Sequence, residues 1–390
     1  IMLEKLNILN QETVETKNKI EMSELEYVNE LLSTYSTTKF KVGSLCTGMA
    51  ALPISLVECG IDFDFEYSVD IDKYCHETIE KNFPELGRQF GNIFEVNPSE
   101  LEYVDILEAG FPCTTFSMAG GRAGFNDSDR GTIIFKIMEI IEHLINVGKA
   151  PKIILLENVK GLLSHNKEGG VFTSIYSLIP NTKIGRSLHI IEMELYSKLN
   201  ELYDISWNVE NSLDYQLPQN RERWFGILTL KSSKYTFDFK KMIKFPLTTT
   251  VRDILEDEST IDNSMYYRRN NFIANNRDFE NQKSTIKVIG AIENISYQQS
   301  KRVLSVDGSS SCLTTGETSK FLVGYRNDNP LVRKLTEKEK LAIHGFPDWF
   351  EFDEKTSKTQ RHKQLGNTIS INVLKAIFNV LFDENNFKDD

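Results

Sequence analysis

The chain has 390 residues, of which 40% are hydrophobic and 26% charged, and its formal net charge is -11. This length predicts two domains, and the composition is typical of a globular protein. The sequence has no apolar run long enough to span a membrane and no secretory signal, so we expect a cytoplasmic protein that contacts no membrane. The acidic balance excludes an indiscriminate polyanion binder, but it allows a local basic cleft.

The five cysteines give no sign of a cross-linked or metal-bound framework. Their number is odd, and no Cys-x-x-Cys pair occurs. A disulfide framework and a zinc site are therefore both unexpected, and we expect no metal.

From residue 39 onward, segments with the pattern of buried strands alternate with helical segments. Strands are expected at 40–48 (including a tight turn), 65–72, 104–110 and 152–159, and helices at 51–60, 73–84, 131–148 and 368–382. This alternation predicts an α/β fold with a doubly wound, mostly parallel sheet. Functional residues are then expected at the carboxyl ends of the strands, where Gly48, Asp70, Cys113 and Glu157 fall.

The alternation weakens after about residue 230, and this change predicts the domain boundaries. We expect residues 1–38 to form an N-terminal helical extension, and 39–230 together with 364–390 to form the main α/β domain. Residues 231–363 are then a second, smaller domain.

The first turn, "SLCTGMAAL", indicates a nucleoside site rather than a dinucleotide site. It has Gly48 but lacks the full glycine fingerprint that cradles a pyrophosphate. Asp70 ends the second strand, where an acid can accept hydrogen bonds from a ribose, and Ile71 could lie against a purine. A ligand without a pyrophosphate, such as S-adenosylmethionine, fits better than NAD. The alternative for Asp70 is a surface acid that simply follows a strand.

Cys113, in "GFPCTTFS", has the setting of a nucleophile. It follows a proline at the end of an apolar strand, and small polar residues come after it. The segment "AGGRAG" (119–124) then supplies three glycines to a loop that could close over a substrate. The alternative is an inert buried cysteine.

Two further segments carry charged groups in unusual places. Glu157 follows a run of apolar residues, where a carboxylate either destabilises the fold or has a function, and Asn158 could orient it. In "PQNRERWFG", Gln219, Arg221 and Arg223 alternate and so share one face of an extended segment. The alternatives are a structural acid that caps the next turn and a solvated strand edge.

In this order, the motifs resemble the cytosine-C5 DNA methyltransferase family. The matching segments are "GFPCTTFS", "RGT" at 130–132, "ENV" at 157–159, "QNRER" at 219–223, "RKLTEKEKLAIHGFP" at 333–347 and "QLGNTISINVL" at 364–374. The first glycine turn is a departure, since it keeps one glycine where the family usually has two. A second departure is Asn92, which stands where the family usually has Asp and which puts cofactor affinity in question.

The resemblance implies a class I, Rossmann-like methyltransferase fold in which 231–363 is a target-recognition domain. It implies methylation of cytosine carbon 5 in a specific double-stranded DNA sequence, with S-adenosylmethionine as methyl donor, by base flipping and a covalent bond from Cys113 to carbon 6. The implied catalytic residues are Cys113, Glu157, Arg221 and Arg223. The implied cofactor residues are Cys46, Gly48, Met49, Ala51, Asp70, Ile71, Asn92, Ile93, Pro112 and Asn367, and the implied DNA contacts are Ser117, Arg130 and Gln219.

Sequence specificity is expected within 231–332. The stretch 231–244 holds five lysines against one acid, and 266–277 holds three arginines and four asparagines. Arg and Asn suit guanine and adenine edges. We expect an enzyme that acts as a monomer on DNA in a bacterial or phage-like setting, and the resemblance allows a cognate restriction endonuclease as a partner. The alternatives are an RNA cytosine methyltransferase, a catalytically inactive DNA-binding relative and a cysteine hydrolase.

Overall fold

The computed structural model divides into two compact units, Ile1–Lys39 and Phe40–Asp390. The structure describes residues 39–111, 133–160, 199–267, 272–275, 284–293, 301–316 and 319–388. The helix expected within 1–38 lies outside these ranges. Each helix in the described ranges is too short or too polar to cross a membrane.

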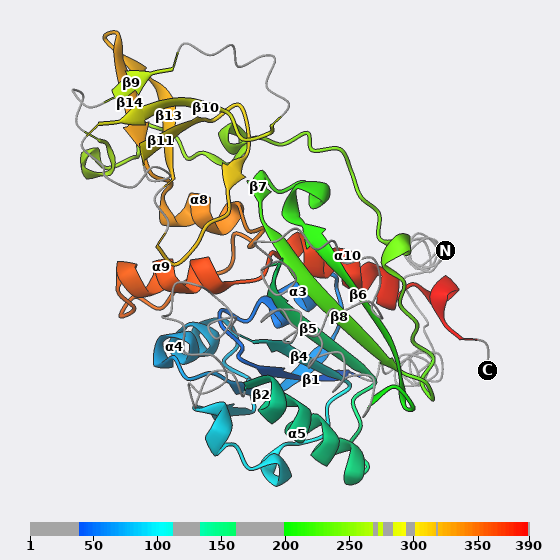
Figure 1. Cartoon of the computed structure of the whole chain (residues 1–390). Helices are drawn as coiled ribbons and strands as arrows, with labels where there is room; N and C mark the ends of the chain where they lie inside the picture. The colour runs from blue at the N-terminus through cyan, green and yellow to red at the C-terminus, as the bar shows by residue number, and fades with distance from the viewer. Residues whose placement is uncertain are drawn as a thin grey trace, which may run out of the picture. The chain divides into compact units, whose positions relative to one another are not determined.

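The main sheet has seven strands in the order β3-β2-β1-β4-β5-β8-β6 (Figure 1). Neighbouring strands from β3 to β5 run parallel, whereas β8 runs antiparallel to both β5 and β6. The strands are β1 (Phe40–Leu45), β2 (Phe63–Val69), β3 (Arg88–Phe90), β4 (Ile106–Gly110), β5 (Ile153–Val159), β6 (Tyr203–Asn211) and β8 (Glu222–Leu230). The doubly wound, mostly parallel sheet expected from the sequence is confirmed.

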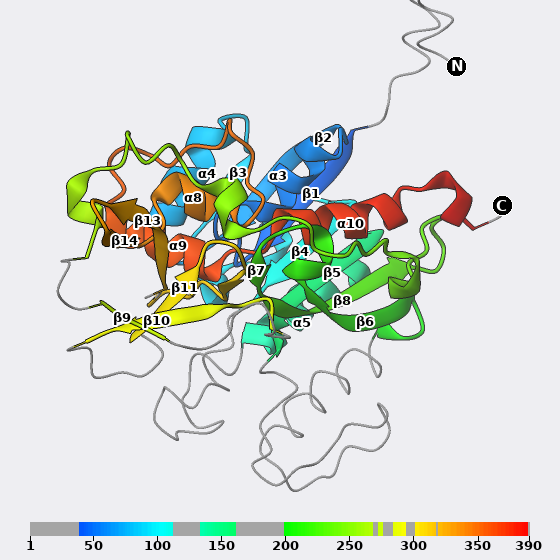
Figure 2. The same ribbon diagram turned by 90° about the horizontal axis from the view of Figure 1, so that it is seen from above.

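Helices cover both faces of this sheet because successive strand residues point to opposite sides. Ile106 and Ile153 pack with α3 and α10, whereas Leu107 and Ile154 pack with α5. Figure 2 shows α3 and α10 on one side of the sheet and α5 on the other. The helices are α3 (Ala51–Glu58), α4 (Lys73–Asn82), α5 (Ile133–Asn146), α8 (Glu337–Ala342), α9 (Lys358–Asn367) and α10 (Ile371–Leu381).

A second sheet, here called the five-stranded sheet, has the order β14-β13-β11-β10-β9. Its strands are β9 (Phe272–Ala274), β10 (Val288–Ile292), β11 (Arg302–Ser305), β13 (Lys320–Arg326) and β14 (Asn329–Arg333). Phe321 and Leu304 pack there with Ile343, which follows α8. A short parallel pair, β7 (Gln219–Asn220) with β12 (Ser310–Ser311), joins this region to the segment that enters β8.

Short 3-10 helices complete the fold. They are η1 (Ile93–Glu95), η2 (Pro98–Glu100), η5 (Ser212–Tyr215), η6 (Phe239–Lys241), η7 (Val251–Ile254), η8 (Asn263–Met265) and η10 (Glu384–Asn386).

The lysine-rich stretch 231–244, which the sequence assigns to the second domain, packs instead with helices of the main sheet. Tyr235, Phe239 and Met242 are buried in the same core as α3 and α10, and the Tyr235 ring lies 5.8 Å from the Phe382 ring. The reason is the antiparallel direction of β8, which pairs Thr229 with Ile153 and so returns the chain to the amino ends of the parallel strands. This stretch therefore packs with α3 and α10, away from the end where β4 and β5 finish.

Candidate active site at the carboxyl ends of the strands

The turn after β1 is built around the Asp70 carboxylate. Cys46, Gly48 and Ala50 all have φ near +60° (58°, 58° and 61°), a left-handed conformation that turns the chain sharply into α3. Gly48 N donates to Asp70 Oδ2 at 2.8 Å, and Asp72 N donates to Asp70 Oδ1 at 2.8 Å. Burial raises the pKa of Asp70 while these two bonds lower it. Asp70 therefore fixes the turn and still has free lone pairs.

Around this turn the structure divides the expected cofactor residues into exposed and buried side chains. Ile71 is 78% exposed, and Asn367, at the end of α9, is exposed as well. Met49 and Ala51 are 1% and 5% exposed, because both belong to the core under α3. Only the backbone of these two residues could meet a ligand.

Asn92 acts as the N-cap of η1. Its Oδ1 accepts from Phe94 N at 3.1 Å, and its Nδ2 donates to Glu95 at 3.3 Å. Ile93, which follows, is buried at 6% exposure. Asn caps a helix about as well as Asp does, so the loop geometry survives the departure from the family pattern although the charge does not.

Glu157 and Arg223 form an ion pair where β5 and β8 meet. Arg223 Nε lies 3.2 Å from Glu157 Oε1, and the two side chains are only 14% and 9% exposed. Burial raises the pKa of Glu157, and Arg223 followed by Arg221 opposes that shift. Gly110 at the end of β4 pairs with Glu157. A carboxyl group so placed can hold a proton nearer neutral pH than an exposed one.

Arg221 is buried at 2% exposure and holds three backbone segments together. Its Nη1 donates to Leu313 O at 2.9 Å, and its Nη2 donates to Gly366 O at 3.1 Å and also to Thr368 O. Burial, with Arg223 next in size, lowers the pKa of Arg221 to about 10. A solvated strand edge is thus excluded for this residue, which supports the site from behind Arg223.

The expected DNA contact by Gln219 has no support in this geometry. Its side chain is fully buried at 0% exposure. Gln219 Oε1 accepts from Leu313 N at 2.9 Å, and Nε2 donates to Ile343 O at 3.3 Å. The alternation in "QNRER" predicted that the three side chains share one face. At the Gln219 end of that face, Leu313 and Ile343 already take up the hydrogen bonds that DNA was expected to make.

Gly366 marks a close backbone approach in the same area. A Cβ at this position would lie 2.3 Å from Thr315 N and 2.5 Å from Thr314 C, distances that no side chain allows. The glycine therefore lets α9 pack against the segment that Arg221 also holds.

Sequence reasoning missed two residues of this site. Cys312 Sγ accepts from Arg221 Nη1 at 3.3 Å and from Arg223 Nη2 at 3.8 Å. Glu108, on β4, is 3% exposed and accepts a hydrogen bond from the Ser44 hydroxyl. The signal for Glu108 was present as an acid inside the apolar segment "DILEAG". No sequence pattern marked Cys312, because only the fold brings it to the two arginines.

Four expected residues, Pro112, Cys113, Ser117 and Arg130, lie outside the described residues. The last described residue before them is Phe111, which follows Gly110 at the end of β4. Among the described residues, no group of three or more His, Cys, Asp and Glu side chains is placed to hold a metal.

The comparisons with known proteins agree with this arrangement. The sequence model of the family described as C-5 cytosine-specific DNA methylase matches residues 40–383. The chain is 32% identical over 352 residues to the Type II methyltransferase M.HhaI of Haemophilus parahaemolyticus, covering 88% of this chain and 94% of that protein. It is also 32% identical over 345 residues to the Type II methyltransferase M.DsaV of Dactylococcopsis salina, covering 87% and 85%.

Among solved structures, the S. pombe Dnmt2 methyltransferase matches the fold with a TM-score of 0.63 at 18% identity, covering 90% of this chain and all of that one. The fold, the order of the site residues and the family match agree, and the chain belongs to the C-5 cytosine-specific DNA methylase family.

Proposed function

We propose that this enzyme, which methylates carbon 5 of cytosine in DNA, takes the methyl group from S-adenosylmethionine through a covalent intermediate at Cys113. The observation that carries the proposal is the buried Glu157–Arg223 pair, with Arg221 behind it. A carboxyl group beside a guanidinium can meet ring nitrogen 3 and the carbonyl oxygen at carbon 2 of one cytosine.

The residues around the first turn fit S-adenosylmethionine. When bound, this molecule supplies an electrophilic methyl group on a sulfonium ion. Asp70 would accept from the ribose hydroxyls, since each of its oxygens uses only one lone pair on a backbone N–H. Ile71 offers an apolar surface that is 78% exposed, and Asn92 could accept from the adenine amino group without a charge. Gly48 lets the turn pass close to the ligand.

The chain's own residues would activate the cytosine. The Cys113 thiolate adds its electron pair to carbon 6, so the electrons of the 5,6 double bond become available at carbon 5. Glu157 donates a hydrogen bond or a proton to ring nitrogen 3, and Arg223 holds the oxygen at carbon 2. After methyl transfer, carbon 5 loses its proton to a base, the double bond re-forms, and the bond from carbon 6 to sulfur breaks to return the thiolate.

The cytosine must leave the duplex for this chemistry, at a cost of roughly a few kcal/mol. Ser117 and Arg130 are our candidates for contacts to the DNA backbone around the flipped base. Pro112 would restrict the backbone before the nucleophile.

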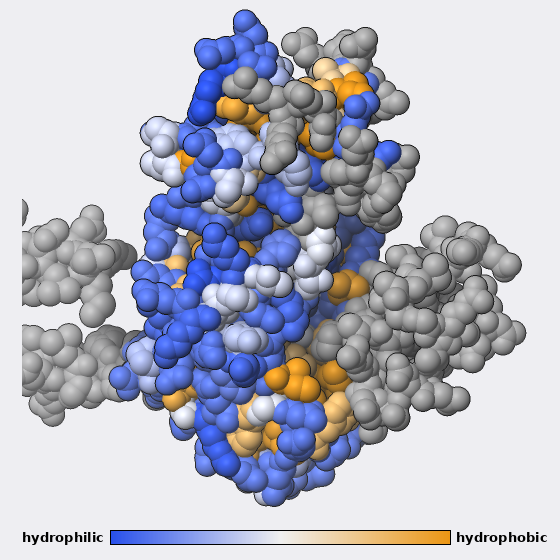
Figure 3. All heavy atoms as spheres, turned by 90° about the vertical axis from the view of Figure 1, so that its left-hand side faces the viewer, coloured by the Kyte–Doolittle hydropathy of each residue, from blue (hydrophilic) through white to orange (hydrophobic). Residues whose placement is uncertain are grey.

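The five-stranded sheet, here called the recognition sheet, and its loops would read the bases around the target. Ile273 on β9 and Tyr325 on β13 are 52% and 66% exposed, which suits contact with a groove. The named relatives are Type II methyltransferases, so a cognate restriction endonuclease and a bacterial or phage-like cytoplasm fit this chain. Figure 3 shows a mostly hydrophilic face with its apolar atoms in small groups, in keeping with a monomer on DNA.

The test is transfer of a labelled methyl group from S-adenosylmethionine to mixed-sequence duplex DNA. We expect wild type and Cys59→Ala to label DNA and Cys113→Ala not to, since Cys59 lies at the end of α3. Bisulfite sequencing of the product then gives the recognition site. Equal labelling by Cys113→Ala would refute the covalent route, and label that enters only RNA would move the substrate to RNA.

A further inference from the structure

Glu108 is a buried acid that the proposed reaction does not use. It lies on β4, where it pairs with Ser44 on β1 and Leu155 on β5, and it is only 3% exposed. The Ser44 hydroxyl and the Gly110 backbone N–H both donate to its carboxylate. A Cβ on Gly110 would lie 3.1 Å from Glu108 Oε1. The carboxyl group therefore lies beside the last residue of β4, three residues before Cys113.

Within the part of the chain that the structure describes, the charged groups with the largest influence on Glu108 have its own sign. Glu157 on the neighbouring strand β5 and Asp70 after β2 both disfavour its ionised form. On the β1 side it meets Ser44 and the Cys46 thiol, whose own ionisation Glu108 opposes. Beyond Gly110 comes the apolar Ile369. Arg223 pairs with Glu157, and the largest influences on Glu108 include neither Arg221 nor Arg223. Among the described residues, no cation forms an ion pair with the Glu108 carboxylate.

An unpaired buried carboxylate is costly to ionise, whereas the neutral acid can stay where it is. Burial, with Glu157 and Asp70 adding to it, raises the pKa of Glu108 to about 8. The neutral acid joins the ends of β1 and β4 without adding a charge beside Glu157.

Building on the proposed function, we propose that Glu108 is a positioning residue whose neutral form keeps the catalytic end of the sheet competent, and whose ionisation switches the enzyme off. A new negative charge beside Glu157 would hold that residue's proton more tightly. Methyl transfer should therefore fall when Glu108 loses its proton, although this side chain touches neither base nor methyl donor.

The first measurement is thermal unfolding from pH 5.5 to 9 for wild type and Glu108→Gln, which keeps the shape but cannot ionise. The pKa of Glu108 is higher in the folded state, so wild type loses stability as pH rises from the unfolded pKa towards about 8. The Tm advantage of Glu108→Gln should grow across that range and then level off. A matched control is Glu210→Gln, because buried Glu210 is paired with Lys244 and should lose stability instead.

The second measurement is the single-turnover rate of methyl transfer against pH. At pH 9 we expect the wild-type rate to be about tenfold below its maximum, because this pH is about one unit above the pKa of the controlling group. Glu108→Gln should keep its rate there. Glu108→Leu, also uncharged, gives the same test if the Gln variant does not fold, and its rate should likewise not fall at high pH.

Parallel Tm curves for wild type and Glu108→Gln would overturn the neutral-acid assignment. Diverging Tm curves with parallel pH–rate profiles would overturn the positioning role. Unfolding requires no methyl transfer, so a complete absence of transfer at every pH would count against the proposed function and would leave the stability test standing.

Discussion

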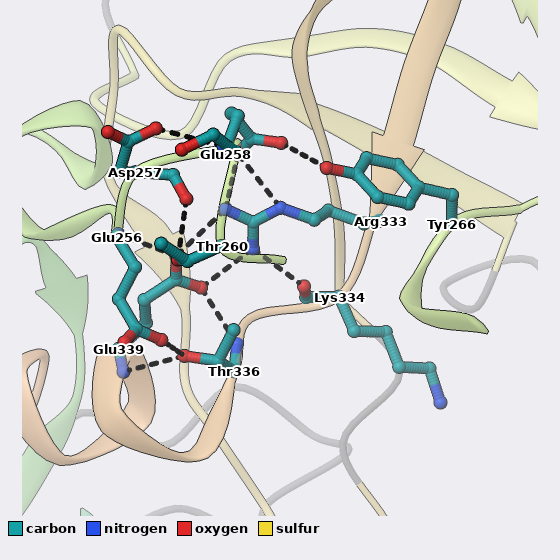
Figure 4. Close-up of polar contacts among 10 residues, drawn as sticks. Glu256, Asp257, Glu258, Thr260, Tyr266, Arg333, Lys334, Thr336 and Glu339 are labelled. Carbon is teal, nitrogen blue, oxygen red and sulfur yellow. Dashed lines mark hydrogen bonds and ion pairs between the residues drawn. The ribbon is translucent and has the colours of Figure 1, made fainter. Parts of the chain in front are cut away.

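Among the described residues, the cluster of buried charged side chains around Arg333 and the cluster around Arg221 and Glu157 are built in opposite ways. The recognition-side cluster centres on Arg333, which is 0% exposed and whose three guanidinium nitrogens all donate to acceptors. Figure 4 shows Glu258 and Glu339 flanking this guanidinium, with Tyr266 and Thr336 bonded to the two acids. The active-site cluster contains Arg221 and Glu157, and its bonding is incomplete.

The difference lies in the groups left without partners. Among the described residues, Arg221 Nε, Asn158 Nδ2 and His344 Nε2 are buried near the site without a hydrogen-bond partner within the protein. By contrast, Arg333 Nη1 lies 2.7 Å from Glu339 Oε2, and Arg333 Nη2 lies 2.8 Å from Glu339 Oε1. Buried polar groups normally have hydrogen-bond partners, so buried donors without a partner in one cluster indicate a place where a ligand binds. We infer that the first cluster holds the fold and the second serves the reaction.

Glu157→Gln should have the largest effect and should separate the two clusters. We expect the methyl-transfer rate to fall by roughly 10²–10⁴-fold, because the amide cannot supply a proton to ring nitrogen 3. The unfolding midpoint should fall less than in Arg333→Met, since Arg223 is 14% exposed and keeps a bond to Glu222 O at 2.8 Å. Single-turnover kinetics and a thermal melt check both parts. A large drop in Tm with an intact rate would mean that Glu157 is a structural acid after all.

Arg333→Met should show the reverse pattern. Removing the cation leaves fully buried Glu339 and partly buried Glu258 without compensation, which typically costs about 3–5 kcal/mol of unfolding free energy. Urea denaturation measures this loss. A loss below about 1 kcal/mol would contradict the view that the cluster holds the recognition sheet to α8.

The fold could be predicted from the sequence where one periodicity dominated. Buried strands such as "KIILLENV" and the helix at 131–148 repeat their apolar residues with clear periods, and both elements are present as β5 and α5. β3 was missed because it has only three residues. The position of 231–244 could not be read locally, since it depends on the direction of β8 across the sheet.

The site likewise has some residues that the sequence predicts and others that only the fold brings together. The order of the motifs in the sequence predicted that Glu157 and Arg223 belong to one site, and the structure places the two side chains in an ion pair. The burial of Gln219 depends on Leu313 and Ile343, residues about a hundred positions away, so no local pattern could reveal it. The pairing of Glu108 with Ser44 likewise requires two strands in register.

His344→Asn tests whether His344, which lies near Arg221 and Arg223, makes the folded protein less stable at acid pH. Burial, followed by Arg221 and Arg223, holds the pKa of His344 well below its usual range, so the folded state keeps this ring neutral. The unfolded state takes up a proton below about pH 6.5. Between pH 6.5 and 5, the unfolding free energy of wild type should therefore fall by about 2 kcal/mol through this residue alone. Denaturant titrations at the two pH values should show a decrease for the variant that is smaller by this amount. Equal losses would exclude His344 as the source.

Arg252→Met should have the smallest effect, and it tests whether burial or pairing gives the Arg333 cluster its importance. Arg252 makes two bonds to Asp307, at 2.6 and 3.0 Å, yet the two side chains are 55% and 59% exposed. Water and salt screen such a pair, so we expect a loss of about 0–1 kcal/mol that shrinks further in high salt. Urea denaturation at two salt concentrations measures it. A loss as large as that of Arg333→Met would show that pairing geometry alone stabilises this region, whereas a small loss leaves burial as the property that separates Arg333 from Arg252.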